Sequence, residues 1–244
     1  MSRHLAATAL ACCALLTACG GGGGDAGAAA PIAGLYEGSG GSNAASELLI
    51  LGSGRYYLVY GLSSASAAPA GGVIVGDGTA SGSGFASTNA HDFNLQSHTL
   101  LTGTLNGTIA PRASANMALL RSDGTGASFS GGFDIASGTA AKVSDLVGTY
   151  GGELAALAGT QASVLTVDAS GALAGGTTGS CTYAGLALPH SEARVFDITL
   201  NFQAGCPNAG STLHGHAFLS GKKLYAVVAS GDLAAVALFA GVKP

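Results

Sequence analysis

The chain contains no tryptophan and little charge. Only 9% of its 244 residues are charged, and nine Lys and Arg stand against 13 Asp and Glu, which gives a net charge of −4. So few cations, scattered singly, cannot neutralise a run of phosphates, and this excludes nucleic acid as a partner. The chain is also 48% hydrophobic, so it lacks the low hydrophobicity and high net charge of a disordered protein.

Long apolar runs are missing beyond the N-terminus. The run from Leu5 to Ala18 is shorter than the roughly 18 residues that a membrane-spanning helix needs. Because Arg3 and His4 precede it, the segment has the build of a secretory signal peptide, which is cleaved from the mature protein. We therefore predict a signal peptide over residues 1–18 and no membrane-spanning helix after it.

The residues at the end of this run, Leu16-Thr17-Ala18-Cys19, resemble the lipobox of bacterial lipoproteins. The resemblance implies that Cys19 carries diacylglycerol and a further fatty acyl chain such as palmitate, and that this lipid anchors the protein in a bilayer. Gly20 rather than Asp follows the cysteine, which resembles the outer-membrane pattern of the bacterial cell envelope and leaves the periplasmic and surface faces both open. The alternative is an ordinary signal peptide in which Cys19 has no role.

A tether follows the lipidated cysteine. Residues 20–31 are GGGGGDAGAAAP, a composition that has no apolar periodicity and behaves as a flexible linker. A linker of this length reaches about 20 Å. We therefore predict residues 19–31 as the lipidated Cys and a Gly/Ala-rich tether that keeps the folded body near the membrane.

A short motif occurs twice in the body of the chain. Gly34-Leu35-Tyr36-Glu37-Gly38 recurs in form as Gly148-Thr149-Tyr150-Gly151-Gly152, and each copy precedes an apolar segment and a glycine turn. Two copies of one structural unit are the simplest explanation. We predict a first unit at residues 32–141 and a second at 142–244, each of normal domain size.

The pattern within the units predicts strands rather than helices. Glycine and β-branched residues interrupt every candidate helix, whereas residues 196–202 alternate apolar and polar side chains as a half-buried strand does. Short strands separated by Gly, Asn, Asp and Ser turns favour antiparallel meanders. We predict an all-β fold of two tandem small antiparallel units, each a calycin-like β-barrel or, alternatively, a β-sandwich. The strands expected in the second unit are 147–153, 163–168, 172–177, 180–187, 194–202, 211–219, 223–229 and 234–240; the clearer ones in the first are 48–51, 56–60, 73–75, 99–109, 115–120 and 127–135, with a loop at 63–72.

Five cysteines are present, and their positions leave one pair in the body. Cys12 and Cys13 lie in the predicted signal peptide and Cys19 is the predicted lipid site, so Cys181 and Cys206 remain. In an oxidising compartment these two are expected to form a disulfide. The chain has neither C-x-x-C nor H-E-x-x-H, so we expect no cysteine-bound metal.

Three further segments, Gly132-Phe133-Asp134, Ser180 to Gly185, and Cys206, carry a second resemblance. The mature chain resembles a group of uncharacterised proteobacterial outer-membrane lipoproteins with duplicated Gly-rich β units. In that group the first unit ends in G-x-F-D and the second carries G-C-x-Y-G before a later cysteine; here Ala184 separates the Tyr from the Gly. The group has no established activity, so the resemblance implies architecture and location only.

His214-Gly215-His216 is the one local pair of metal ligands in the sequence. On a strand the two imidazoles share a face about 7 Å apart. That spacing suits a weak metal clamp if His190 or a carboxylate approaches, and otherwise the pair is a solvated strand face. Because the sequence fixes no third ligand, we predict no metal and no cofactor other than the lipid on Cys19, and keep His214 and His216 as weak candidates.

No catalytic residue is predicted. His91-Asp92 and His98 with a nearby Ser would supply the inventory of a hydrolase, but the chain has no G-x-S-x-G elbow. Tyr56, Tyr57 and Tyr60 place two aromatic rings on one face of a strand and one on the other, either as core and surface residues or as part of a ligand-lining patch.

Together these observations predict a non-enzymatic, membrane-anchored envelope lipoprotein whose outer faces and loops contact an unknown protein or glycan. The alternative is a calycin-like carrier that holds a small apolar ligand inside one barrel. The state of the interior separates the two hypotheses. A cavity of several hundred Å³ favours the carrier, and a filled interior favours the contact protein.

Overall fold

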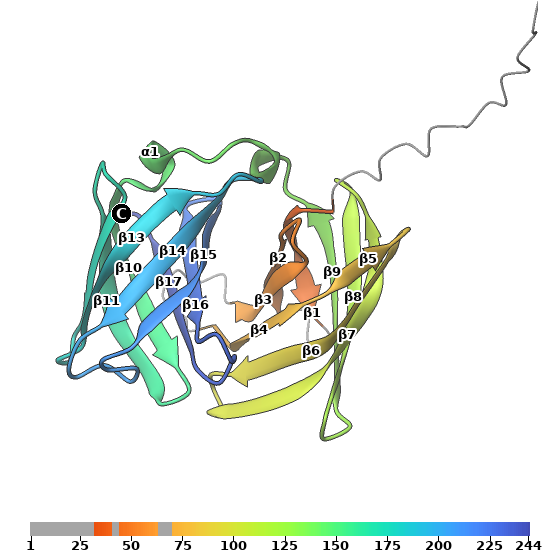
Figure 1. Cartoon of the computed structure of the whole chain (residues 1–244), viewed down its shortest axis with the longest axis horizontal. Helices are drawn as coiled ribbons and strands as arrows, with labels where there is room; N and C mark the ends of the chain where they lie inside the picture. Colours follow the sequence, from red (N-terminus) through yellow and green to blue (C-terminus); the bar gives the residue numbers. More distant parts are fainter. Residues whose placement is uncertain (1–31, 41–43, 63–69) are drawn as a thin grey trace, which may run out of the picture.

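The computed structural model describes residues 32–40, 44–62 and 70–244. The predicted signal peptide, the lipid site Cys19 and the tether at 19–31 lie outside the described residues, as does most of the predicted loop at 63–72. No helix in the described ranges is long and apolar enough to cross a membrane. The described chain is all-β and forms two closed antiparallel barrels of eight strands each, one after the other in the sequence (Figure 1).

The first barrel is a meander whose two ends meet. β1 pairs with β2 on one side and with β9 on the other. The ring closes where β4 pairs with β6, for example Val73 opposite Phe93, and the short β5 lies outside the ring, paired with β6. The strands are β1 (Gly34–Gly40), β2 (Ala45–Ile50), β3 (Arg55–Leu62), β4 (Gly72–Asp77), β5 (Thr79–Ser81), β6 (Gly84–Asn94), β7 (Thr99–Ala110), β8 (Ser114–Arg121) and β9 (Gly126–Phe133).

The second barrel is an uninterrupted meander. Each strand pairs with the next, and β17 returns to β10, with Gly152 opposite Gly241. The eight predicted strands are present and the sandwich alternative is not realised. The strands are β10 (Gly148–Ala156), β11 (Gly159–Val167), β12 (Ala172–Thr177), β13 (Thr182–Pro189), β14 (Val195–Phe202), β15 (Thr212–Ser220), β16 (Lys223–Ala229) and β17 (Val236–Val242). A short 3-10 helix (Ile135–Gly138) and α1 (Val143–Leu146) join the barrels, on either side of the predicted domain boundary (Figure 1).

The motif that recurs in the sequence starts both barrels in the same way. The hydroxyl of Tyr36 donates to the carbonyl of Ile32 at 2.9 Å, and that of Tyr150 donates to the carbonyl of Leu146 at 2.8 Å. Gly34 and Gly148 precede these tyrosines with φ of 147° and 143°, a conformation that residues with a Cβ rarely adopt. The recurring motif therefore has the same structural role in both barrels. A glycine begins the first strand, and the tyrosine two residues later holds the preceding segment by a hydrogen bond.

Apolar side chains fill three separate regions. One lies inside the first barrel and one inside the second, where the alternation predicted for residues 196–202 is confirmed because all four apolar members point inward. The third lies between the barrels, and we call it the seam. It joins the outward faces of β2, β3, β4 and β6 to those of β14 to β17. Its members include Leu49, Tyr57, Val73 and Phe93 from the first barrel and Phe218, Tyr225, Val227 and Leu238 from the second.

The seam also buries a carboxyl group. Glu47 is 8% exposed, and burial, with a smaller contribution from the charge of Glu37, raises its pKa to about 7. The hydroxyl oxygen of Ser220, from the second barrel, lies 2.7 Å from a Glu37 oxygen and 2.9 Å from a Glu47 oxygen. Ser220 has one hydroxyl proton to share between these two acceptors. Burial of Glu47 favours the protonated form of its carboxyl group.

Cys181 and Cys206 are bonded, as predicted, with their Cα atoms 4.3 Å apart. Cys181 comes directly before β13, and Cys206 lies in the turn after β14, the neighbouring strand. Both half-cystines pack into the interior of the second barrel. The bond therefore closes one end of this barrel across two adjacent strands.

Candidate functional site

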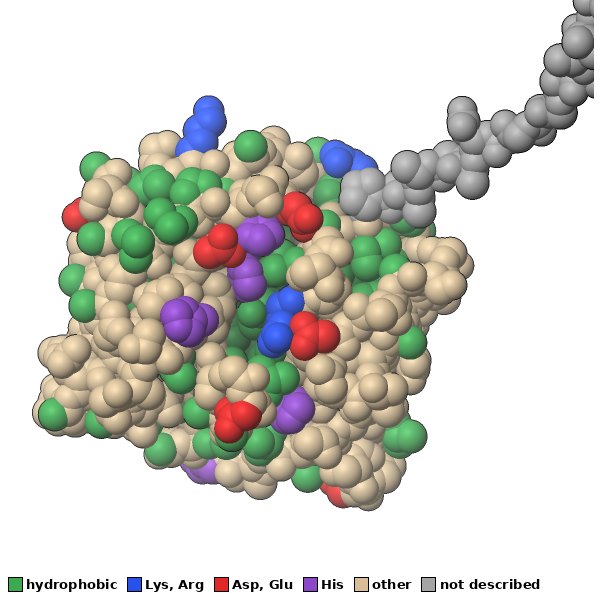
Figure 2. Space-filling model, viewed as in Figure 1, with side chains coloured by type: hydrophobic (Ala, Val, Ile, Leu, Met, Phe, Trp, Pro, Cys, Tyr) green, Lys and Arg blue, Asp and Glu red, His purple; other side chains and the backbone are tan. Residues whose placement is uncertain are grey.

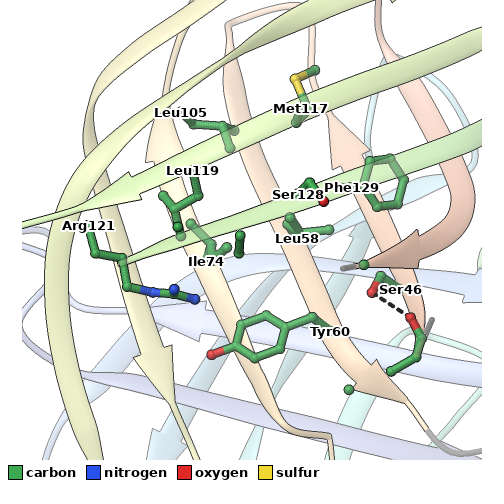
Figure 3. A pocket seen from close by; sticks show the side chains of 15 residues that line it. Ser46, Leu58, Tyr60, Ile74, Leu105, Met117, Leu119, Arg121, Ser128 and Phe129 are labelled. Atoms are coloured by element: carbon green, nitrogen blue, oxygen red, sulfur yellow. Dashed lines mark hydrogen bonds between the residues drawn. The ribbon is translucent and has the colours of Figure 1, made fainter. Parts of the chain in front are cut away.

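A cavity of about 390 Å³ lies inside the first barrel. Its wall is mainly apolar and comes from strands on several sides of the ring (Figure 3). This volume falls within the range of about 300 to 1,000 Å³ that is typical of small-molecule sites. The apolar lining residues are Leu58, Ile74, Leu105, Met117, Leu119 and Phe129.

Small residues leave this space unfilled. Gly40, Ser46 and Ala127 line the cavity from β1, β2 and β9, on the strand faces whose other members point into the barrel. Gly126, which also lines the cavity, is exposed, and Ala44 is partly exposed. Among the described residues, therefore, the cavity extends from an apolar interior to one end of the barrel.

A group of polar side chains with no net charge forms part of the cavity wall, through Tyr60 and Arg121. Arg121 Nε donates to Asp92 Oδ2 at 2.5 Å, and the hydroxyl of Tyr60 donates to Asp92 Oδ1 at 2.7 Å. The Asp92 side chain is only 3% exposed and that of Arg121 16%. Burial, and then the charge of Asp92, raises the pKa of Tyr60, so the phenol stays protonated and donates. The two charges compensate each other, which leaves the cavity suited to an uncharged or weakly polar ligand.

The interior of the second barrel is occupied by large side chains. β14 alone sends Phe196, Ile198, Leu200 and Phe202 inward. The ring of Tyr183 lies over Gly175, where an added Cβ would come within 2.3 Å of it. The Tyr183 hydroxyl lies 2.8 Å from the Ser163 hydroxyl. Burial raises the pKa of Tyr183 to about 12.

A second candidate site lies on the outer face of the second barrel, next to the seam. Asp197 Oδ1 is 2.7 Å from His190 Nδ1 and 3.1 Å from His216 Nε2. One ligand atom from each of the three residues lies within 4.8 Å of the others. His214 does not join this group and instead contacts the hydroxyl of Thr199 at 3.1 Å. The structure thus brings His216 together with His190 and Asp197 rather than with His214.

Tyr57 reaches this group from the first barrel. Its hydroxyl lies 2.8 Å from His216 Nδ1, and the two ring centroids are 5.4 Å apart. Burial lowers the pKa of His216 in spite of the neighbouring Asp197 carboxylate, so the imidazole is neutral near pH 7. Because His216 faces a phenol rather than a serine hydroxyl, the group does not support a hydrolase.

A hollow of about 380 Å³ adjoins the histidines between the two barrels. Figure 2 shows histidine, acidic and basic side chains gathered around a hollow on this face of the molecule. Arg55 and Asp77, an ion pair at 2.8 Å, belong to its wall on the side of the first barrel. His214 and Ser230 belong to its wall on the side of the second.

The structure does not bring together the remaining candidate residues of the sequence analysis, His91, Asp92 and His98. His91 Nδ1 contacts the backbone carbonyl of Asn89 at 2.8 Å, whereas the neighbouring Asp92 points inward to Arg121. His98 lies in the turn after β6 with φ of 56°. The proposed His–carboxylate dyad is therefore not formed by His91 and Asp92.

The tyrosines of β3 divide as expected for a strand. Tyr56 and Tyr60 face the interior of the first barrel and Tyr57 faces the seam. Tyr56 donates to Ser87 at 3.0 Å, and Tyr60 lines the cavity. The roles of Arg121 and Asp197 were not anticipated. Arg121 ends β8 on the face whose other members are buried. Asp197, by contrast, lies on the outer, polar face of β14 with Thr199 and Asn201.

Comparison with known proteins found no matching family model, no matching curated protein and no matching solved structure.

Proposed function

We propose that the protein is a membrane-anchored, non-enzymatic carrier that holds a small apolar ligand inside its first barrel. The cavity of about 390 Å³ is the observation that supports this function. Of the two functions derived from the sequence, it favours the carrier over the contact protein, because an interior serving only as a core has no use for a void of this size. The proposed anchor is the lipid on Cys19.

The lining defines the class of ligand. Six of the side chains that line the cavity are large and apolar, and the charge of Arg121, which also lines it, is compensated by Asp92. An anion would have to compete with Asp92 for the guanidinium, whereas an apolar molecule gains about 25 cal/mol for each Å² of surface that it buries. The chemistry therefore suits a hydrocarbon-like molecule with at most one small polar group.

The decisive experiment fills the cavity from its wall. Ala127 lines the cavity on β9, while Ala118 lies on the opposite, exposed face of the adjacent β8. We expect Ala127→Leu to reduce binding of an apolar fluorescent probe such as N-phenyl-1-naphthylamine by about tenfold or more, because the new side chain occupies the ligand volume. Ala118→Leu, which adds the same atoms outside the barrel, should leave binding unchanged.

Two results would contradict the carrier. One is the absence of saturable probe binding by the unsubstituted protein, and the other is equal binding by Ala127→Leu and Ala118→Leu. The anchor is tested separately, since Cys19→Ser should release the protein from the membrane fraction of a bacterial host. If the Cys19→Ser protein stays in that fraction, the lipid anchor on Cys19 is contradicted. The carrier function does not depend on that result.

A further inference from the structure

Two histidines and one carboxylate on the second barrel converge on a point that the carrier function does not use. His190 follows β13, Asp197 lies on β14 and His216 on β15. These three consecutive segments are neighbours in the sheet, and Asp197 pairs directly with His216 in the ladder. Register alone therefore places the side chains of β14 and β15 side by side on the outer face.

The arrangement of the three ligand atoms matches the ligand set of a tetrahedral metal site. Zinc binds imidazole nitrogen and carboxylate oxygen at about 2.0 to 2.2 Å, so neighbouring ligand atoms of a tetrahedral site lie about 3.3 Å apart. The observed separations from Asp197 Oδ1 are 2.7 Å to His190 Nδ1 and 3.1 Å to His216 Nε2. The ligand nitrogens of His190 and His216 lie within 4.8 Å of each other, so the three ligand atoms already surround one point.

Tyr57 is placed to select the tautomer that such a site requires. A metal-bound histidine normally donates its second ring N–H to an oxygen, which fixes the ring and leaves the other nitrogen free to bind. The Tyr57 hydroxyl lies 2.8 Å from His216 Nδ1. In the tautomer in which Nδ1–H donates a hydrogen bond to that oxygen, the lone pair of Nε2 points toward Asp197 and His190.

Access and charge also suit a cation. The Asp197 side chain is 52% exposed, so an ion can enter from solvent. The nearby Arg55 is paired with Asp77, and its charge is therefore largely compensated. His190 and His216 are 22% and 16% exposed, so the ligands are partly held in place by packing.

We propose that His190 Nδ1, Asp197 Oδ1 and His216 Nε2 bind one zinc-type divalent cation, with a fourth position open to water, and that Tyr57 is a positioning residue for His216. Three protein ligands with an open position form a recognised class of zinc site. All three ligands belong to the second barrel and Tyr57 to the first. The bound ion therefore strengthens a contact that crosses the seam.

The test is a calorimetric titration of the EDTA-stripped mature protein with ZnCl₂. We expect saturable binding of one Zn²⁺ per chain. His216→Ala and Asp197→Asn should each weaken it by more than about 100-fold, which exceeds the usual effect of losing an outer partner. Asp197→Asn changes a half-exposed side chain and tests the site even if His216→Ala fails to fold.

The matched control is His214→Ala, because His214 lies on the same face of β15 but contacts Thr199. It should bind Zn²⁺ as the unsubstituted protein does. Tyr57→Phe keeps the ring and loses the hydroxyl, and should weaken binding about tenfold. A purely structural role for Tyr57 would lower the melting temperature in EDTA without changing zinc affinity.

Cobalt gives an independent readout. Co²⁺ in a tetrahedral site has intense visible absorption, which we expect for the unsubstituted protein and for His214→Ala but not for Asp197→Asn. The proposal is overturned if the unsubstituted protein binds no Zn²⁺, if His214→Ala loses as much affinity as His216→Ala, or if Asp197→Asn binds Zn²⁺ as tightly as the unsubstituted protein. None of these results depends on whether the first barrel carries a ligand.

Discussion

The two barrels have the same number of strands and the same entry motif, yet one contains a cavity and the other is filled by large side chains. The strands on either side of the seam show the difference. β14 sends Phe196, Ile198, Leu200 and Phe202 inward, whereas Ser46, the first inward residue of β2, is small and lines the cavity of the first barrel. Barrel closure therefore sets the size of the enclosure, and the volume of the inward side chains decides whether it holds space.

Other parts of the two interiors are built alike. In the first barrel the ring of Phe129 lies over Gly131, where an added Cβ would come within 2.5 Å of it, and in the second Phe239 lies over Gly241 at 2.6 Å. This repeated pair comes from the last strand of each unit, which pairs with the first strand of that unit. The last strand is thus alike in the two barrels, and the difference between their interiors lies elsewhere in the ring.

Leu→Ala substitutions at matched positions in the two barrels are expected to change the free energy of unfolding most, and they test the difference in interior packing directly. Leu200 in the second barrel and Leu119 in the first are both buried, but Leu119 lines the cavity of the first barrel and Leu200 belongs to the apolar interior of the second. Leu→Ala changes cost about 2 to 5 kcal/mol, and the cost rises with the space they create and the contacts they remove. We expect about 4 kcal/mol for Leu200→Ala and about 2 kcal/mol for Leu119→Ala by denaturant unfolding. Equal losses would show that the first interior is packed as tightly as the second.

Removal of the disulfide should act on one barrel. The bond links residues 25 positions apart, and the loss of its constraint on the unfolded chain corresponds to about 3 kcal/mol. The Cys181→Ala, Cys206→Ala double variant should therefore have a less stable second barrel. Hydrogen exchange of the strand amides measures this loss. The amides of the first barrel are the internal control, and an equal loss of protection there would mean that the two barrels unfold as one unit.

The smallest expected effect concerns the seam and depends on pH. The pKa of Glu47 is about 7 in the folded protein against 4.5 in the unfolded chain. Its contribution to stability is therefore complete below pH 4.5 and is lost as the pH rises toward 7, because the folded state retains a proton that the unfolded state releases. The loss between pH 5 and pH 8 amounts to about 2 to 3 kcal/mol.

The variant Glu47→Gln should remove this dependence, since an amide cannot titrate. We expect its free energy of unfolding to fall less than that of the unsubstituted protein between pH 5 and pH 8, as measured by urea titration at each pH. Ser220→Ala is a useful companion, because it removes the hydroxyl shared by Glu37 and Glu47. A Glu47→Gln protein with an unchanged pH profile would show that another group is responsible.

Much of this architecture was predictable from the sequence because it depends on local patterns. The recurring glycine and tyrosine, the alternation over residues 196–202 and the turn residues gave an all-β chain of two units, and the remaining cysteine pair gave the disulfide. β6 (Gly84–Asn94) was missed because its polar residues and the register shift between Ser87 and Ala90 break the alternation.

The seam and the sites were not predictable in the same way, because they depend on contacts between distant strands. One signal of the seam was nevertheless present. Residues 48–51 and 236–240 are continuous apolar runs, which indicate strands buried on both faces. The grouping of His190, Asp197 and His216 required the register of three strands, and the contact from Tyr57 required the packing of one barrel on the other.

The pairing of β1 with β9 and of β10 with β17 has an evolutionary consequence. Each unit leaves its sheet beside the strand at which it entered, so its two ends lie close together, the arrangement that makes domains tolerant of insertion and circular permutation. A coding segment with such ends can be copied in tandem without breaking a single ladder of hydrogen bonds. One copy is then free to lose side-chain volume and acquire a ligand while the other preserves the fold.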